Sequence, residues 1–160
     1  MNNILLETIN LKKTYKHVNG NITLFNNLNL KIKSGDLIAL VGPSGSGKSS
    51  LLHLLALLDE PTKGKILINN KETKSLTDIQ KDEIRREYIS IIFQENNLLT
   101  DFTALENIMM PLLIKGENKK KTFEKAQKIL KDVKIFNRSS HFPGELSGGE
   151  QQRVAIARAL

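Results

Sequence analysis

The sequence predicts an α/β protein with an N-terminal antiparallel β-layer, a parallel-sheet core that contains a glycine-rich loop, and a helical subdomain. Three observations predict this fold class. Apolar and polar residues alternate over residues 4–15 and 22–32, as in half-buried strands. An apolar run at residues 37–41 comes directly before a glycine-rich stretch and a helix-like segment. Beyond residue 94 the pattern becomes helical, which predicts parts at residues 1–94 and 95–160.

Each strand and the first helix have a local signal. The two alternating segments flank Asn19-Gly20, a dipeptide typical of hairpin turns. Residues 37–41 do not alternate, which predicts a strand buried on both faces, and residues 88–93 are β-rich in the same way. Between them we expect a helix over residues 48–58 and a short strand over residues 65–68.

Three capping boxes mark the expected helix starts. In each, a serine or threonine is followed three residues later by Glu or Gln, so that the two side chains and two backbone N–H groups can satisfy one another. They are Thr77–Gln80, Thr103–Glu106 and Ser147–Glu150. The helix that begins at the first of them is expected to reach about Arg86.

The composition bounds the class of protein. The chain has 160 residues, 39% of them hydrophobic and 26% charged, which suits one compact domain. It has no cysteine, so disulfide frameworks and thiolate metal sites are excluded. No apolar run approaches the roughly 18 residues of a membrane span, and no secretory signal is visible. We therefore expect a cytoplasmic protein.

The net charge of +7 arises largely from eight lysines within residues 115–134. Nucleic-acid binding would favour stacking aromatics among them, and Phe123 is the only aromatic residue there. Phe123, Ala126, Leu130 and Val133 recur at helical spacing, which predicts a buried stripe with lysines on the solvated face. Anionic lipid headgroups or nucleic acid are the alternative partners of this face, but no nucleic-acid partner is expected.

Residues 42–49, GPSGSGKS, fit the pattern G-x-x-x-x-G-K-[ST] between an apolar strand and an apolar helix. Glycines let successive N–H groups point at phosphate oxygens, and the helix start adds its positive end. Lys48 would reach the β- and γ-phosphates, and the Ser49 hydroxyl would bind Mg²⁺. The alternative is a glycine-rich turn before a helix. The nucleotide-binding residues expected here are Gly42, Pro43, Ser44, Gly45, Ser46, Gly47, Lys48, Ser49 and Ser50.

Residues 146–153, LSGGEQQR, have the character of a second anion site. Ser147 would cap a helix, and the two glycines after it would allow close backbone approach. An ordinary capped helix is the alternative. Two glycines in a first turn cost roughly 1 kcal/mol each relative to alanine, which argues against a purely structural role.

Residues 146–152 resemble the signature motif of ABC transporter ATP-binding subunits, and residues 154–160 match the helix that follows it in that family. The resemblance covers essentially the whole chain and implies an ATPase that uses ATP and Mg²⁺. It implies that Ser147, Gly148 and Gly149, with Glu150 beside them, bind ATP held by the phosphate loop of a second identical subunit. The family also implies integral membrane transporter subunits as partners, with this subunit at the cytoplasmic face of the inner membrane.

The same resemblance assigns two further residues. Tyr15 stands where the family has an aromatic residue that stacks on adenine, although a strand residue packed in the β-layer is the alternative. Gln94 resembles the Q-loop glutamine, which contacts Mg²⁺ and the attacking water, and the segment after it docks on the membrane subunit. The resemblance therefore assigns catalytic roles to Lys48 and Gln94, and metal ligation to Ser49 and Gln94.

Within the family, the sequence most resembles the ATPases of lipoprotein-releasing systems, at residues 51–55, 101–107 and 145–160. Macrolide-exporter and cell-division ATPases look similar, and an inactive fragment that only binds nucleotide is a further alternative. A nucleic-acid-associated ABC ATPase would be expected to carry two cassettes or a long insertion. One departure from the family is Ser49-Ser50, where Ser-Thr is usual.

Asp59-Glu60 follows apolar residues and looks like the Walker B carboxylates, but we reject this assignment. Asp59 lies eleven residues after Lys48 on one expected helix, about 16 Å away along its axis. No other apolar run ends in Asp-Glu before Leu160. We therefore expect that these 160 residues alone do not hydrolyse ATP, which needs a residue that positions or deprotonates water.

Overall fold

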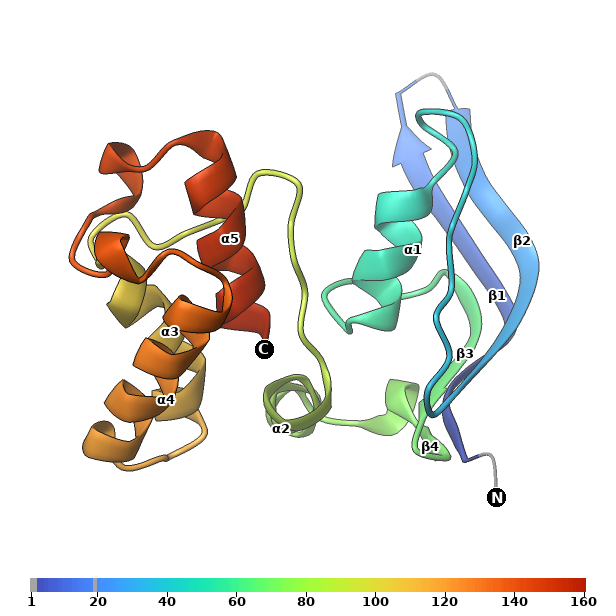
Figure 1. Cartoon of the computed structure of the whole chain (residues 1–160). Coiled ribbons are helices and arrows are strands. Elements are labelled where there is room, and N and C mark those ends of the chain that lie inside the picture. Colours follow the sequence, from blue (N-terminus) through green and yellow to red (C-terminus); the bar gives the residue numbers. More distant parts are fainter. Residues whose placement is uncertain (1–2, 19) are drawn as a thin grey trace. The chain divides into compact units, whose positions relative to one another are not determined.

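The computed structural model describes residues 3–18 and 20–160, and these fall into two compact units that divide between Arg85 and Arg86. The first unit contains the β-layer and the phosphate loop. The second contains the helical block (Figure 1). The sequence pattern placed the change of character after residue 94, inside the second of these units.

The first unit is built on one antiparallel sheet with the strand order β2-β1-β3-β4. Two long strands form a curved hairpin (Figure 1), and their alternation follows the sequence pattern. Residue Asn19 of the expected turn lies outside the described residues. The strands are β1 (Ile4–His17), β2 (Gly20–Lys33), β3 (Lys63–Ile68) and β4 (Lys71–Glu72).

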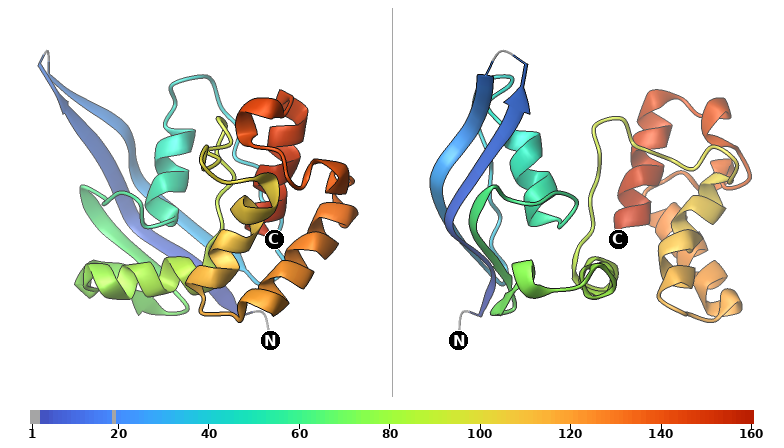
Figure 2. Two further views of the ribbon diagram at one scale, coloured as in Figure 1. Left: turned by 90° about the vertical axis from the view of Figure 1, so that its left-hand side faces the viewer. Right: turned by 180° about the vertical axis from the view of Figure 1, so that it is seen from behind.

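Helix α1 (Lys48–Leu55) lies along the sheet and buries Leu51 and Leu54 (Figure 2). The predicted helix is confirmed, but it ends at Leu55 rather than at residue 58. Leu57 adopts a left-handed conformation with φ 58°, which a continuing helix does not allow. The chain turns there and returns to the sheet through β3.

Residues 37–41 and 88–93 are not strands, so the expected parallel-sheet core is absent from the described residues. Residues 37–41 are irregular and lie open to solvent, with Leu37 fully exposed and Val41 85% exposed. The second segment begins at the last residue of a helix and is then irregular. A strand needs a neighbour to accept its N–H groups and supply donors to its carbonyls, and no described strand pairs with either segment.

The capping boxes mark the helix starts as predicted. Gln80 N donates to Thr77 Oγ1 at 3.3 Å, and Thr77 N donates to Gln80 Oε1 at 2.9 Å. Thr103 makes the same reciprocal arrangement with Glu106. The helices are α2 (Asp78–Tyr88), α3 (Ala104–Ile114), α4 (Lys119–Asp132) and α5 (Gly148–Ala159); the 3₁₀ turns are η1 (Thr73–Ser75), η2 (Phe136–Arg138) and η3 (Pro143–Glu145).

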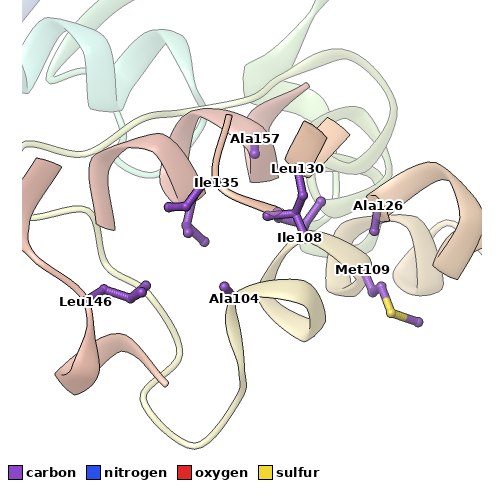
Figure 3. Close-up of a cluster of buried hydrophobic side chains, with 9 residues drawn as sticks. Ala104, Ile108, Met109, Ala126, Leu130, Ile135, Leu146 and Ala157 are labelled. Atoms are coloured by element: carbon purple, nitrogen blue, oxygen red, sulfur yellow. The ribbon is translucent and has the colours of Figure 1, made fainter. Parts of the chain in front are cut away.

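The second unit packs α3, α4 and α5 around one apolar cluster (Figure 3). Its centre is formed by residues such as Ile108, Leu130 and Val154, each at most 2% exposed. Within the described part of the chain, no helix has the length and hydrophobicity of a membrane span. The cluster consists of Ala104, Ile108, Met109, Ala126, Leu130, Ile135, Leu146, Val154 and Ala157.

Helix α4 shows the expected amphipathic arrangement with one correction. Ala126 and Leu130 are buried, but Phe123 is 41% exposed. Thr122 is buried in its place, because the stripe continues at intervals of four residues from Leu130 back through Ala126. Phe123 therefore lies at the edge of the stripe, beside the lysines.

Candidate functional site

The predicted phosphate loop, residues 42–49, is an exposed run of turns that leads into α1. Gly45 and Gly47 have left-handed backbones, with φ 77° and 90°. At Gly47 space is also tight, because an added Cβ would lie 3.0 Å from Leu24 Cβ on β2 and Leu24 would have to shift. Leu24 is two residues from Ile22, the cross-strand partner of Tyr15, so the end of the loop packs near that part of the hairpin.

Lys48 lies with its ammonium group against the loop. Its Nζ donates to the carbonyl oxygens of Gly42 at 2.9 Å and of Pro43 at 2.7 Å. Gly47 occupies the N-cap of α1, and no side chain caps this helix. The N–H groups of the first turn therefore stay available at the positive end of the helix, a combination suited to phosphate.

Ser49 and Ser50 follow in the first turn of α1, and Ser49 is exposed at the surface. A serine hydroxyl is a hard oxygen ligand of the kind that Mg²⁺ prefers. The residues of this loop thus fit a magnesium–nucleotide complex: one hydroxyl for the ion, one ammonium group and uncapped N–H groups for the phosphates.

Tyr15 does not pack into the β-layer. The residue is 41% exposed on β1, and its hydroxyl donates to Asp59 Oδ2 at 2.9 Å. The Lys13 Nζ atom lies 4.7 Å from the centre of the Tyr15 ring and donates to Asp59 Oδ1 at 2.7 Å. These contacts hold the ring in one orientation while leaving it open to a stacking partner.

Asp59 and Glu60 form the turn after α1 and are both engaged by lysines. Burial alone would raise the pKa of Asp59, but the hydrogen bonds from Lys13, from the Glu60 backbone and from Tyr15 outweigh it and hold the pKa below its ordinary value. Glu60 accepts from Lys81 at 2.7 Å, and that bond lowers the Glu60 pKa. The two carboxylates therefore join the turn to β1 and α2, a structural role that accords with their rejection as Walker B residues.

Gln94 belongs to the second unit, where it is exposed in a turn that ends at Asn96. Asn96 N donates to Phe93 O at 3.1 Å and closes the turn. Asn96 and Asn97 have left-handed backbones, with φ 58° and 44°. Asparagine tolerates this conformation better than most residues, so the sequence suits the turn.

Ser147 caps α5 as predicted. Its side chain accepts from Glu150 N at 3.4 Å, and Ser147 N donates to Glu150 Oε2 at 2.8 Å. Arg138 Nε donates to the other carboxylate oxygen of Glu150 at 2.9 Å. The Ser147 backbone N–H, followed by Arg138, lowers the pKa of Glu150 to about 2.

Gly148 and Gly149 lie exposed in the first turn of α5. A Cβ added to either would meet no atom within 4 Å, so packing inside this chain does not require glycine there. Among the hydrogen bonds of the described residues, none uses the N–H group of Gly148 or Gly149. This turn therefore presents two free donors on a surface without side chains.

The sequence motifs did not indicate the side chains that hold Tyr15, Glu150 and the chain after Gln94 in place. Lys13 supports Tyr15, and Arg138 supports Glu150. Two others, Asn107 and Arg158, hold the chain after Gln94. One signal was present for Lys13, because it falls on the inward side of the alternating pattern of β1, where a lysine needs a partner.

Comparisons with known proteins indicate the same family as the sequence motifs. The family model described as ABC transporter matches residues 25–160. The lipoprotein-releasing system ATP-binding protein LolD of Rickettsia bellii is 48% identical over all 160 residues, which cover 70% of that relative. The protein of the same name from Rickettsia conorii is 47% identical over the same span and with the same coverage.

Solved structures agree with this similarity. A dimeric structure of the ATP-binding cassette MJ0796 in a post-hydrolysis state, bound to ADP and Pi, is 41% identical to this chain. The match has a TM-score of 0.92 and covers 98% of this chain and 69% of that one. A second dimeric structure of MJ0796, described as a bacterial ABC transporter cassette, matches with the same values.

Proposed function

The chain belongs to the ABC transporter family, as an ATPase subunit that couples ATP hydrolysis to transport, and from this premise we propose that it powers lipoprotein release from the bacterial inner membrane. The observation that carries the proposal is the 48% identity, over the whole chain, to a relative named for lipoprotein release. We further propose a peripheral position at the cytoplasmic face of that membrane.

In the first unit, the phosphate loop would hold the nucleotide of its own subunit. The uncapped start of α1 and the Lys48 ammonium group supply positive charge where the β- and γ-phosphates would lie. The exposed ring of Tyr15, oriented by Asp59 and Lys13, would stack on adenine. Pro43, Ser44, Gly45 and Ser46 would shape the loop around the phosphates.

Magnesium fits the Ser49 hydroxyl of the phosphate loop, a hard oxygen ligand of the kind this ion prefers. When bound, Mg²⁺ neutralises charge on the phosphate oxygens. The Gln94 carboxamide would orient the attacking water. It cannot serve as a base, because an amide has no accessible proton-accepting pKa.

In the second unit, Ser147, Gly148, Gly149 and Glu150 would contact ATP bound by another copy of this chain. The two free N–H groups of the first turn of α5 are the donors, and the absence of side chains lets a γ-phosphate approach the backbone. The capping box and Arg138 fix the orientation of this turn. We therefore propose a head-to-tail homodimer with ATP between the subunits.

The membrane subunits would contact residues 95–103, which follow Gln94. Leu99 and Phe102 in this segment are 41% and 37% exposed, whereas Leu98 packs against the core of the helical unit. Two exposed apolar side chains on a short segment suit a protein contact.

The test is reconstitution of the full-length protein with the membrane subunits of a lipoprotein-releasing complex in liposomes that carry a lipidated substrate protein. ATP should release the substrate into solution, and Lys48→Ala should abolish that release. A matched control is Lys71→Ala, at an exposed lysine of β4 in the same unit. ATP turnover without release, when several lipidated substrates have been offered, would contradict the assignment to lipoprotein release.

A further inference from the structure

Two side chains of the second unit hold the chain between Gln94 and α3. The first is Asn107, on α3, which has no solvent-accessible surface. The second is Arg158, near the end of α5. Both bind backbone atoms of residues 96–103, and neither lies in a nucleotide-binding motif.

Asn107 uses its whole carboxamide group. Its Oδ1 accepts from Leu99 N at 2.8 Å. Its Nδ2 donates to the carbonyl oxygens of Leu99 at 3.0 Å, Phe102 at 2.9 Å and Thr103 at 3.0 Å. A carboxamide has both the acceptor and the donors for these bonds, which a carboxylate or an alkyl group of similar size does not have. Leu99 O also accepts from Phe102 N, and Thr103 O from Asn107 N, so loss of the side chain would remove the partner of Leu99 N and of Phe102 O.

Arg158 reaches the chain immediately after the Gln94 turn. Its Nη2 donates to Asn96 O at 2.8 Å, and its Nη1 donates to Asn97 O at 2.6 Å. One guanidinium group thus binds two successive carbonyls, and the planar fork fixes their separation and direction. The helix that carries Arg158 is α5, whose first turn contains Gly148 and Gly149.

These contacts determine which apolar side chains the segment exposes. Asn107 binds the backbone of Leu99 and Phe102, two apolar residues whose side chains remain exposed. Leu98 turns the other way and packs on the core cluster. Leu99 and Phe102 are therefore presented from a fixed backbone, which reduces the conformational entropy that a partner must remove on binding.

We propose that Asn107 and Arg158 are positioning residues that join residues 96–102 to α3 and α5, so that Leu99 and Phe102 meet the membrane subunit in an orientation set by the signature helix. This inference rests on the proposed function, since it needs a membrane partner at that segment. The partner surface it implies is an apolar cytoplasmic segment of the membrane subunit. The two residues would act on the coupling between partner and ATP turnover and would touch neither ATP nor the partner.

The experiment uses the full-length protein, free and in complex with its membrane subunits, and compares Arg158→Gln and Asn107→Ala with two matched controls. Arg86→Gln removes an arginine of the same unit whose Nε donates to Glu87 Oε1 at 3.2 Å. Asn118→Ala removes an asparagine of the same unit that caps α4. Both controls lose side-chain hydrogen bonds away from residues 96–103.

We expect Arg158→Gln and Asn107→Ala to keep the turnover of the free subunit within about twofold. The extra turnover caused by the membrane subunits should fall about tenfold, a coupling change within the usual 5–150-fold range. Arg158→Lys, which keeps the charge but loses the fork, should recover only part of the coupling. The controls should leave the coupling unchanged. If free and complexed turnover fall together in Arg158→Gln, as they would from a general loss of stability, the inference is overturned.

Amide hydrogen exchange on the free protein separates this inference from the proposed function. Residues 97–102 should exchange at least tenfold faster in Arg158→Gln and Asn107→Ala than in the parent, and at the parent rate in both controls. If the parent protein fails to engage the membrane subunits, the proposed function fails, and exchange still decides whether the two residues hold the segment. Unchanged exchange at residues 97–102 would overturn their positioning role directly.

Discussion

The phosphate loop and the start of α5 are both glycine-rich segments that open a helix, and they are built differently. In the phosphate loop, Gly45 and Gly47 have left-handed backbones, and the helix that follows has no side-chain cap. At the start of α5, neither glycine is left-handed, and Ser147 and Glu150 cap the helix reciprocally. The two segments therefore use glycine for different physical reasons.

The difference shows what each segment is arranged to meet. In the phosphate loop, the fold of the chain itself favours glycine, since Gly47 has a left-handed backbone and a Cβ there would press on Leu24. At Gly148 and Gly149 the space is open, so any demand for glycine comes from a surface outside this chain. The first segment also carries a cationic side chain, because Lys48 Nζ lies on the loop carbonyls. At the second segment, Arg138 is bound to the Glu150 carboxylate. This difference supports the proposal that the first segment binds ATP of its own subunit and the second contacts ATP held by another copy.

The largest effect is expected from Lys48→Ala, which removes the charge from the first segment only. Charge-assisted contacts of this kind contribute roughly 1.5–3 kcal/mol, so ATP affinity should fall at least tenfold. Calorimetric titration of the full-length protein with ATP measures the change, and Lys71→Ala is the control. Equal affinity in the Lys48→Ala variant would show that residues 42–49 are not the nucleotide site.

Gly149→Ala tests the second segment. An added methyl group meets nothing inside the chain, and alanine is the better helix former by up to about 1 kcal/mol, so the folded protein should be no less stable. ATP turnover of the dimer should nevertheless fall about tenfold, because a methyl group obstructs the ATP site at each subunit interface. Binding of ATP to the single subunit should stay unchanged.

The matched control is Gly144→Ala, at another glycine whose added Cβ would meet nothing within 4 Å. Its turnover should equal that of the parent. A Gly149→Ala variant that is equally active would remove the argument for an outside surface, and the two glycine-rich segments would then differ only in their local folding.

The contrast also shows which features a sequence reveals. The three capping boxes at Thr77, Thr103 and Ser147 were predicted because each depends on residues three apart. The glycine-rich loop at residues 42–49 and the start of α1 were predicted because their motif is contiguous in the sequence. Residues 37–41 and 88–93 were predicted wrongly as strands, because a strand forms only with a neighbour, and a local pattern does not supply one.

The supporting contacts escaped prediction because they are distant in sequence. Lys13 and Asp59 are 46 residues apart, Arg138 and Glu150 are 12 apart, and Arg158 and Asn96 are 62 apart. No periodicity relates such pairs. Asn107 falls within a helix-forming pattern, where a buried asparagine has no distinguishing local signal. Motifs therefore indicated where ligands would bind, and the structure was needed to see what holds those motifs in place.

A substitution at Tyr15 tests whether adenine stacks beside the phosphate loop, and we expect it to change ATP affinity less than Lys48→Ala does. Tyr15→Ala should weaken ATP binding about fivefold, since base–aromatic stacking contributes roughly 1–3 kcal/mol and the site is partly solvated. Tyr15→Phe keeps the ring and loses the bond to Asp59, so affinity should stay within about twofold of the parent. The control is Ile22→Ala, at the exposed cross-strand neighbour of Tyr15. A loss of affinity equal in both Tyr15 variants would point to the hydroxyl rather than to stacking.

The smallest expected effect is on how stability depends on pH. It distinguishes the two segments, because only the helix of the second has an acidic residue in its first turn. The pKa of Glu150 is lowered from 4.5 to about 2, so its contribution to stability is fully present above pH 4.5 and is lost as the pH falls towards 2. Glu150→Gln should therefore lower the free energy of unfolding at neutral pH. Its difference from the parent should shrink between pH 4.5 and 2, as measured by denaturant unfolding at a series of pH values.

Arg138→Gln should reduce this pH dependence without abolishing it, because the Ser147 backbone N–H is the larger cause of the shift in the Glu150 pKa. If the parent and Glu150→Gln lose stability in parallel between pH 4.5 and 2, the capping carboxylate is not what holds the first turn of α5, and the contrast with the uncapped phosphate loop loses its electrostatic part.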